Sequence, residues 1–263
     1  MSEPHNNIHI QPIAAFSDNY IWLIYNSETR DACVVDPGDA QPVLSALKQL
    51  ELNLTAILIT HHHLDHVGGM AALQEACSVK VFGPNNPAIS GIDHTVGAGD
   101  TATVLGVDFQ VLEVPGHTLD HIAYFNSEGS PVLFCGDTLF AGGCGRVFEG
   151  NPPMMHSSLQ SLAALPASTR VYCAHEYTMA NLAFAVAVDP KNKALQQRIA
   201  EAEKTRAKNM PTVPSEISLE LATNPFLRCS DAGIRESLAA QGKLAGDTDS
   251  EVFAAVRAWK DNF

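Results

Sequence analysis

The sequence predicts an α/β sheet domain followed by a smaller α-helical domain. Short runs rich in β-branched and aromatic residues dominate the first two thirds of the chain, and helical spacing takes over from about residue 176. The charge changes at the same point. Residues 1–175 carry 5 Lys and Arg against 17 Asp and Glu, whereas residues 176–263 carry 11 against 12. We therefore expect two domains, residues 1–175 and residues 176–263.

Eight apolar runs are long enough for strands and are bounded by polar or turn residues. The expected strands are 20–25, 32–36, 56–60, 79–83, 107–114, 121–126, 131–137 and 170–175. Five other segments place apolar residues near helical spacing. The expected helices are 40–52, 70–77, 180–188, 193–209 and 249–263. Pro190 and the segments 210–216 and 242–249 break the helical part.

Composition excludes several classes of function. A net charge of −13 over 263 residues argues against a nucleic-acid partner, because phosphate backbones are bound by clustered Lys and Arg. The chain has no secretory signal pattern and no apolar run of the roughly 18–20 residues that span a bilayer. Its six scattered cysteines are typical of buried thiols rather than of a disulfide framework. We expect a cytoplasmic monomer with a small-molecule substrate and no membrane partner.

The stretch ILITHHHLDHVGGMAAL, residues 57–73, contains four of the eleven histidines within six positions. The histidines follow the expected strand 56–60, and such strand ends are where open α/β sheets usually build their sites. Side chains alternate in extended chain, so His61 and His63 point one way and His62 the other. Asp65 and His66 come from the turn that follows. Crowding these groups without a metal ion is electrostatically costly, so we expect a metal site.

Three further candidate ligands each follow a predicted strand. They are His117 in VPGHTLDH, Asp137 in LFCGDTLF and His175 in VYCAHEYT. Five histidines and two aspartates are too many for one tetrahedral ion, and they suit two ions that share a carboxylate. His62 is expected to support or pack against a ligand, and the role of His121 stays open. No metal-like context surrounds His5, His9, His94 or His156.

THHHLDH matches the T-H-x-H-x-D-H signature of the metallo-β-lactamase superfamily, and the later His, Asp and His follow in the same order. The resemblance implies an αβ/βα four-layer sandwich for residues 1–175. It also implies one ion on His61, His63 and His117, and a second ion on Asp65, His66 and His175. Asp137 would bridge them, and Asp65 and Asp137 would position a bridging hydroxide. Zn is expected first, although His/Asp sites of this kind also accept Fe or Mn.

The rest of the chain narrows the resemblance. Four segments, CGDTLFAGGCGRVFEG, AHEYTMANLAFA, TNPFLR and RAWKDNF, together resemble the glyoxalase II (hydroxyacylglutathione hydrolase) family over essentially the whole chain. That family's activity implies hydrolysis of S-D-lactoylglutathione, an S-(2-hydroxyacyl)glutathione, to glutathione and D-lactate. This thioesterase reaction is the second step of methylglyoxal detoxification. The resemblance further implies that glutathione contacts Arg146, Tyr177, Arg257 and Lys260.

Two positions depart from the family pattern, and two other functions stay open. Phe148 replaces a Tyr of many relatives, so a hydroxyl contact to glutathione is absent there, and Arg146 stands where Lys is common.

The first alternative function is that of an iron-dependent glutathione persulfide dioxygenase, which shares much of the histidine pattern. The second is a non-catalytic scaffold of the same fold. No GxSxG elbow indicates a serine nucleophile.

Overall fold

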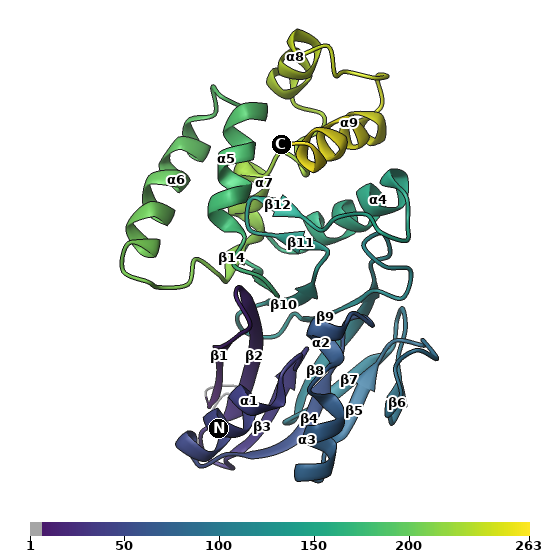
Figure 1. Ribbon diagram of the computed structural model, residues 1–263, viewed down its shortest axis with the longest axis vertical. Coiled ribbons are helices and arrows are strands. Elements are labelled where there is room, and N and C mark those ends of the chain that lie inside the picture. The colour runs from purple at the N-terminus through teal and green to yellow at the C-terminus, as the bar shows by residue number, and fades with distance from the viewer. Residues whose placement is uncertain (1–6) are drawn as a thin grey trace. The chain divides into compact units, whose positions relative to one another are not determined.

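The computed structural model describes residues 7–263, and the first six residues, His5 among them, lie outside the described part. Figure 1 labels the helices and strands. The chain divides into two compact units, which we describe separately. The first unit runs to Glu113 and includes Asp120–Gly136; the second contains Val114–Leu119 and Asp137–Phe263. These units do not follow the boundary expected at residue 175, which stays a prediction.

A six-stranded mixed sheet forms one layer of the first unit. Its strands in spatial order are β1 (Ile8–Ala15), β2 (Asn19–Asn26), β3 (Asp31–Val35), β4 (Asn53–Leu58), β5 (Lys80–Gly83) and β6 (His94–Thr95). The first three strands are antiparallel, and β3 to β6 are parallel. Parallel neighbours bring their carboxyl ends to one edge of the sheet, and β4 ends there just before the histidine cluster.

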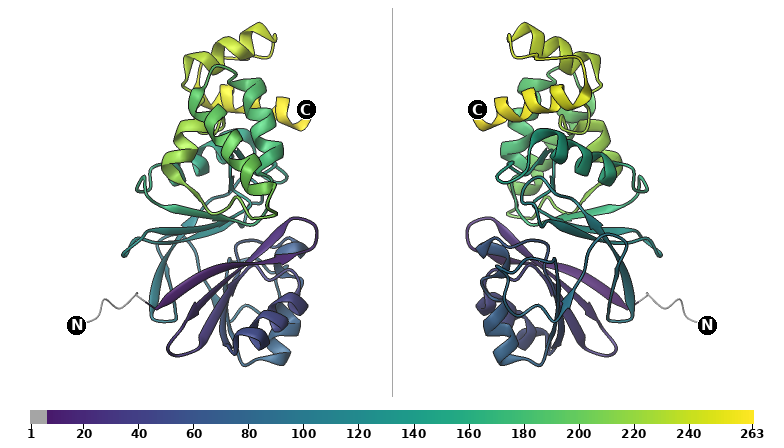
Figure 2. Two further views of the ribbon diagram at one scale, coloured as in Figure 1. Left: turned by 90° about the vertical axis from the view of Figure 1, so that its left-hand side faces the viewer. Right: turned by 90° about the vertical axis from the view of Figure 1, so that its right-hand side faces the viewer.

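Helices α1 (Ala40–Leu50) and α3 (Met70–Ala76) cover one face of this sheet (Figure 2). The side chain of Asp39 accepts a hydrogen bond from the Gln41 N–H, which caps the start of α1. Val43 and Leu47 of α1 are buried in one apolar cluster with sheet residues such as Ile57. This packing anchors both ends of the segment that carries the histidines. That segment includes the single-turn helix α2 (Leu64–Val67).

A second, antiparallel sheet of the first unit contains β7 (Thr101–Val104), β8 (Val107–Glu113), β9 (Ile122–Asn126) and β10 (Val132–Gly136). Every residue of β9 is buried. The hydroxyl of Tyr124 in β9 donates to the carbonyl of Ile59, just beyond β4, at 2.8 Å. This hydrogen bond joins the two sheets directly beside the histidine cluster.

The second unit is mainly helical. It contains two short antiparallel pairs: β11 (Leu139–Phe140) with β12 (Gly143–Cys144), and β13 (Arg170–Cys173) with β14 (Ser215–Glu216). Its helices are α4 (Pro152–Ala163), α5 (Thr178–Val188), α6 (Lys193–Arg206), α7 (Ile217–Thr223), α8 (Ala232–Ala240) and α9 (Asp249–Asp261). Side chains that accept backbone N–H groups begin four of them, at Asn151, Asn192, Asp231 and Thr248.

All eight expected strands and all five expected helices are present, with ends that shift by a few residues. The sequence analysis missed several elements, including β1, β7, α4 and α8. In β1 the apolar alternation is interrupted by Pro12, which an edge strand tolerates because it lacks one neighbour. In α4 two prolines open the helix, and Ser and His are weak helix formers, so local propensity does not mark it. Burial of Met155, Leu159 and Leu162 stabilises it instead.

Two expectations from composition can be compared with the structure. The six cysteines are free thiols, and five of them are buried, as predicted. Burial raises the pKa of Cys144 to about 11 and that of Cys173 to about 12, so neither supplies a thiolate nucleophile near neutral pH. Within residues 7–263, no helix combines the length and the apolar character needed to cross a membrane.

Candidate metal centre

The first-unit cluster consists of His61, His63, Asp65 and His66. Beyond β4 the chain stays extended to His63, which precedes the single turn of α2. The His63 carbonyl accepts the His66 N–H at 2.9 Å, and this bond turns His66 back toward the extended segment. Gly68 follows because a Cβ there would lie 2.7 Å from the carbonyl oxygens of Gly38 and Leu64. Glycine therefore permits the close approach that ends the turn.

The ligand atoms of this cluster lie close together. His61 Nε2 is 3.1 Å from His63 Nδ1, as the alternation of side chains predicts. The rings of His61 and His66 have centroids 4.1 Å apart, and His66 Nε2 is 3.5 Å from Asp65 Oδ2. His61 and His66 are fully buried, where two imidazolium charges would be very costly. Neutral imidazoles whose nitrogens converge are suited to binding a cation.

Hydrogen bonds orient these ligands. Asp36 Oδ2 lies 3.0 Å from His66 Nδ1 and accepts the Thr60 hydroxyl at 2.7 Å, while Oδ1 accepts the Thr60 N–H at 2.8 Å. A carboxylate on Nδ1 leaves Nε2 of His66 as the nitrogen that could bind a metal ion. Asn19 donates to Asp65 Oδ2 at 3.0 Å. Sequence analysis missed Asp36 and Asn19, although Asp36 also follows a strand, which is the signal that located the other candidate ligands.

The second-unit cluster consists of His117, Asp137 and His175, all buried. Asp137 lies between the two histidines. Its Oδ2 is 3.5 Å from His117 Nε2, and its Oδ1 is 3.3 Å from His175 Nε2. One carboxylate thus directs a separate oxygen toward each imidazole, so Asp137 could serve both sides of a metal centre.

Backbone contacts hold this second-unit cluster in place. His117 Nδ1 donates to the carbonyl of Arg146 at 2.7 Å, so Nε2 is the nitrogen that could bind a metal ion. Gly145 makes this approach possible, because a Cβ there would lie 1.9 Å from the carbonyl oxygen of Asp137. The ring of Tyr177 stacks on His175 with centroids 4.6 Å apart.

The remaining histidines make contacts of other kinds. His62 turns to Asp120, with its Nδ1 3.0 Å from Oδ1, and Asn86 holds the other oxygen of that carboxylate at 2.7 Å. His121, whose role the sequence left open, stacks on His61 with centroids 4.5 Å apart. It therefore packs against a candidate ligand. Outside the clusters, His9, His94 and His156 lie against Tyr25, Phe82 and Phe253 respectively.

The expected glutathione contacts of the second unit differ in exposure. Arg146 is mostly exposed, with 61% of its side-chain surface accessible, whereas Arg257 is buried. Arg257 donates to the carbonyl of Cys144 at 3.1 Å and to Asp261 Oδ1 at 2.8 Å. The same carboxylate oxygen lies 3.7 Å from Nε of Arg146. Asp261 is therefore a carboxylate that already pairs with two of the predicted cations, and sequence analysis missed it.

Lys260 completes this set of cations. Its ammonium donates to the carbonyl of Ala180 at 3.2 Å and lies 5.1 Å from the centre of the Phe184 ring. Burial, followed by the neighbouring charge of Arg257, lowers the pKa of Lys260. The nearby carboxylate of Asp261 acts in the opposite direction, so the charge at this end of α9 is partly balanced.

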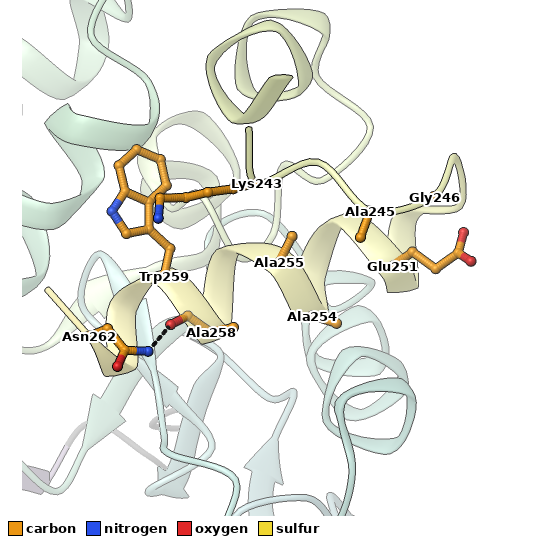
Figure 3. Close-up of a pocket in the computed structure, with 9 residues that line it drawn as sticks. All are labelled: Lys243, Ala245, Gly246, Glu251, Ala254, Ala255, Ala258, Trp259 and Asn262. Carbon is orange, nitrogen blue, oxygen red and sulfur yellow. Dashed lines mark hydrogen bonds between the residues drawn. The ribbon is translucent and has the colours of Figure 1, made fainter. Parts of the chain in front are cut away.

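The opposite face of α9 borders a pocket of about 740 Å³ (Figure 3). Small side chains such as Ala254, Ala255 and Ala258 line it together with Trp259, and Lys243 lies over the Trp259 ring at 5.4 Å. Arg257 and Lys260 are not among its lining residues. The pocket is therefore distinct from the predicted glutathione contacts.

Comparison with known proteins identifies the family. The family model described as "Metallo-beta-lactamase superfamily" matches residues 16–175. The family model described as "Hydroxyacylglutathione hydrolase C-terminus" matches residues 176–263. A Pseudomonas aeruginosa protein named hydroxyacylglutathione hydrolase is 53% identical over 257 residues, which cover 97% of this chain and all of that protein. A protein of the same name from Chromohalobacter salexigens is 52% identical, with 96% and 98% of the two chains covered.

Solved structures agree on the fold. ETHE1 from Myxococcus xanthus has a TM-score of 0.63 at 28% identity, covering 96% of this chain and 97% of that one. TTHA1623 in a di-iron-bound form has a TM-score of 0.59 at 25% identity, covering 83% of this chain and all of that one.

The predicted metallo-β-lactamase fold with a C-terminal helical region is confirmed. Together with the His and Asp clusters, this fold supports the binding of divalent metal ions. The chain belongs to the hydroxyacylglutathione hydrolase family of the metallo-β-lactamase superfamily.

Proposed function

We propose that this chain is a hydroxyacylglutathione hydrolase that converts S-D-lactoylglutathione to glutathione and D-lactate. The observation that carries the proposal is the identity of about half of all residues with relatives of that name over nearly their full length. The donor sets add chemical support, since buried histidines and aspartates whose ligand atoms converge suit a metal-dependent hydrolase.

We propose that two divalent ions bind the seven ligands. The first would use His61, His63 and His117, and the second would use Asp65, His66 and His175, with Asp137 shared. Zn is the first candidate and Fe or Mn the alternatives, because nitrogen and carboxylate donors accept all three. Such ions would supply a Lewis acid that lowers the pKa of a water nucleophile and stabilises the oxyanion formed on the thioester carbonyl.

The side chains of this chain would orient that chemistry. Asp65 is held by Asn19, and Asp137 offers one oxygen to each neighbouring histidine. These two carboxylates would position the nucleophile by accepting its proton in a hydrogen bond. A thioester has a good leaving group, so no nucleophilic side chain is needed. Buried thiols such as Cys173, whose pKa is raised to about 12, are unsuited to that role.

We further propose that residues 1–175 form the catalytic domain and residues 176–263 the substrate-binding domain. Glutathione carries two carboxylates, and Arg146, Arg257 and Lys260 would bind them, with Tyr177 as a further contact to glutathione. Asp261 already pairs with Arg257, so the substrate would compete with this carboxylate for the same guanidinium. Phe148 lies under Arg146 at 5.9 Å and offers no hydroxyl, so contacts there would be apolar or cation–π.

The cysteines indicate the cellular setting of the protein. Free, mostly buried cysteines suit a reducing compartment, so we propose a cytoplasmic enzyme of methylglyoxal detoxification. We also propose that it acts as a monomer.

The decisive experiment combines metal analysis of purified protein with two assays. We expect about two divalent ions per chain. We also expect hydrolysis of S-D-lactoylglutathione, which is monitored through the loss of the thioester absorbance. Removal of the ions with a chelator should abolish turnover, and Zn, Fe or Mn should restore it. Oxygen uptake with glutathione persulfide and no thioester hydrolysis would instead identify the dioxygenase alternative. A metal-loaded protein inactive in both assays would favour the scaffold.

A further inference from the structure

An ion pair that the proposed mechanism does not use is buried in the second unit. Arg198 of α6 is 6% exposed, and Glu220 of α7 is completely buried. The guanidinium donates to Glu220 Oε1, to the Thr223 hydroxyl at 2.6 Å and to the Ser215 hydroxyl at 3.0 Å. Buried ion pairs can often be replaced by apolar residues without loss of stability. The other contacts of Glu220 indicate a role beyond stability.

The second carboxylate oxygen of Glu220 binds the turn between β11 and β12. Glu220 Oε2 accepts the Gly142 N–H at 2.9 Å and the Asn224 side-chain amide at 2.9 Å. The same amide nitrogen of Asn224 donates to the Gly143 carbonyl at 2.9 Å. Gly142 has a φ of 68°, a conformation that glycine adopts at little cost. Glu220 and Asn224 thus form hydrogen bonds to the backbone of this turn. Without them the buried Gly142 N–H and Gly143 carbonyl would lose these partners.

The hairpin of β11 and β12 contacts both a candidate metal ligand and a predicted substrate-binding residue. The β11–β12 hairpin starts two residues after Asp137. The ring of Phe140 meets His175 edge-on with centroids 5.8 Å apart, and Tyr177 with centroids 5.3 Å apart. At the other end of the hairpin, the carbonyl of Cys144 accepts a hydrogen bond from Arg257 at 3.1 Å. A shift of this hairpin would therefore move metal-binding and substrate-binding groups together.

We propose that Glu220 is a positioning residue, whose Oε2 fixes the β11–β12 turn and through it Asp137, Phe140 and the partner carbonyl of Arg257. The inference rests on the proposed function for its catalytic consequence. Arg198 neutralises and orients the carboxylate, and Asn224 of the TNPFLR segment binds the other side of the turn. The essential element is an acceptor for the Gly142 N–H, and the negative charge is secondary.

Two double variants separate the acceptor from the charge. In Arg198→Met with Glu220→Gln, the charge is gone but the amide oxygen can still accept the Gly142 N–H. In Arg198→Met with Glu220→Met, both the charge and the acceptor are gone. Because both variants replace the ion pair with neutral groups of similar size, both should fold. Glu216→Gln, an exposed carboxylate next to the same helix, serves as the control.

Three measurements are made on each folded variant: hydrogen exchange of the peptide 138–145, bound metal per chain, and kcat and KM. We expect the Met–Met variant to exchange this peptide faster, to bind metal about 10–100-fold more weakly and to lose about 100-fold in kcat/KM. The Met–Gln variant should stay within about threefold of the parent in all three measurements. This factor corresponds to a free-energy difference of roughly 1 kcal/mol or less. Equal values for the two double variants would overturn the proposal, whether both are normal or both are impaired.

Two further results keep the test decisive. If the Met–Met variant does not fold, Asn224→Leu removes the donor on the other side of the turn, and unchanged exchange and metal binding in that variant would also overturn the proposal. Hydrogen exchange and metal binding do not depend on the reaction. A parent enzyme that hydrolyses no glutathione thioester would therefore refute the proposed function while leaving this positioning role testable.

Discussion

The two ligand clusters of this protein are built in different ways. The first-unit cluster lies within six consecutive residues, and one extended segment with one helical turn gathers all four side chains. In the second-unit cluster His117, Asp137 and His175 are separated by 20 and 38 residues along the chain. Local geometry makes the first cluster nearly unavoidable once β4 forms. The second cluster exists only when several separate elements pack correctly, so we expect it to be more sensitive to distant substitutions.

The largest effect is expected at Asp137, because it contacts both histidines of the second-unit cluster. Asp137→Ala should lower metal content and reduce kcat/KM by about 1,000-fold or more, since a shared carboxylate contributes several kcal/mol. Metal analysis and thioester hydrolysis measure these effects. Asp108→Asn is the control, because Asp108 is an exposed carboxylate that accepts a hydrogen bond from the Thr103 hydroxyl. This substitution should change neither the metal content nor kcat/KM. A variant at Asp137 with near-normal rate would show that the second-unit cluster is not needed.

A smaller effect is expected from the support of the first-unit cluster. In Asp36→Asn an amide would replace one of the oxygens that bind His66 and Thr60, so the orientation of His66 should be lost in part. We expect metal affinity to fall about 10–100-fold, measured by competition with a chelator. Asp39→Asn, which keeps the helix cap, should leave it unchanged. Normal affinity in Asp36→Asn would mean that local backbone geometry alone orients this cluster.

Substrate affinity should depend on the second unit alone. Arg257→Ala with Lys260→Ala should raise KM for the glutathione thioester about 10-fold or more and leave kcat nearly unchanged, because these cations bind far from the reacting carbonyl. A small neutral thioester should be unaffected. Since Arg257 is buried and paired, the melting temperature is measured as well. An unchanged KM, or an equal loss with both substrates, would refute the assignment.

The smallest effect concerns the helix that carries these cations. Thr248 begins α9, and its hydroxyl and the Glu251 side chain exchange hydrogen bonds with each other's backbone N–H. Thr248→Ala should destabilise the folded chain by about 1 kcal/mol, seen as a lower urea midpoint, with little change in metal affinity. Thr248→Ser should retain the cap. A marked loss of metal from Thr248→Ala would show that α9 supports the metal ligands as well.

Some features of the protein follow from the sequence alone. The alternation of apolar runs indicated the α/β part, and the change of spacing near residue 176 indicated the helical part, because both depend on local periodicity. The first-unit cluster could be predicted for the same reason: its spacing places His61 and His63 on one side of an extended segment. The later candidates were found through a second local rule, that polar residues at strand ends gather at one edge.

Tertiary structure decided the rest, since the contacts concerned join residues far apart in the chain. No local pattern marks Glu220 as the partner of the Gly142 N–H, 78 residues away, or Cys144 as the acceptor for Arg257. Only the structure shows that Arg257, an expected glutathione contact, is buried and paired with Asp261. Burial and pairing depend on how elements pack together, and the sequence encodes that packing only through the fold as a whole.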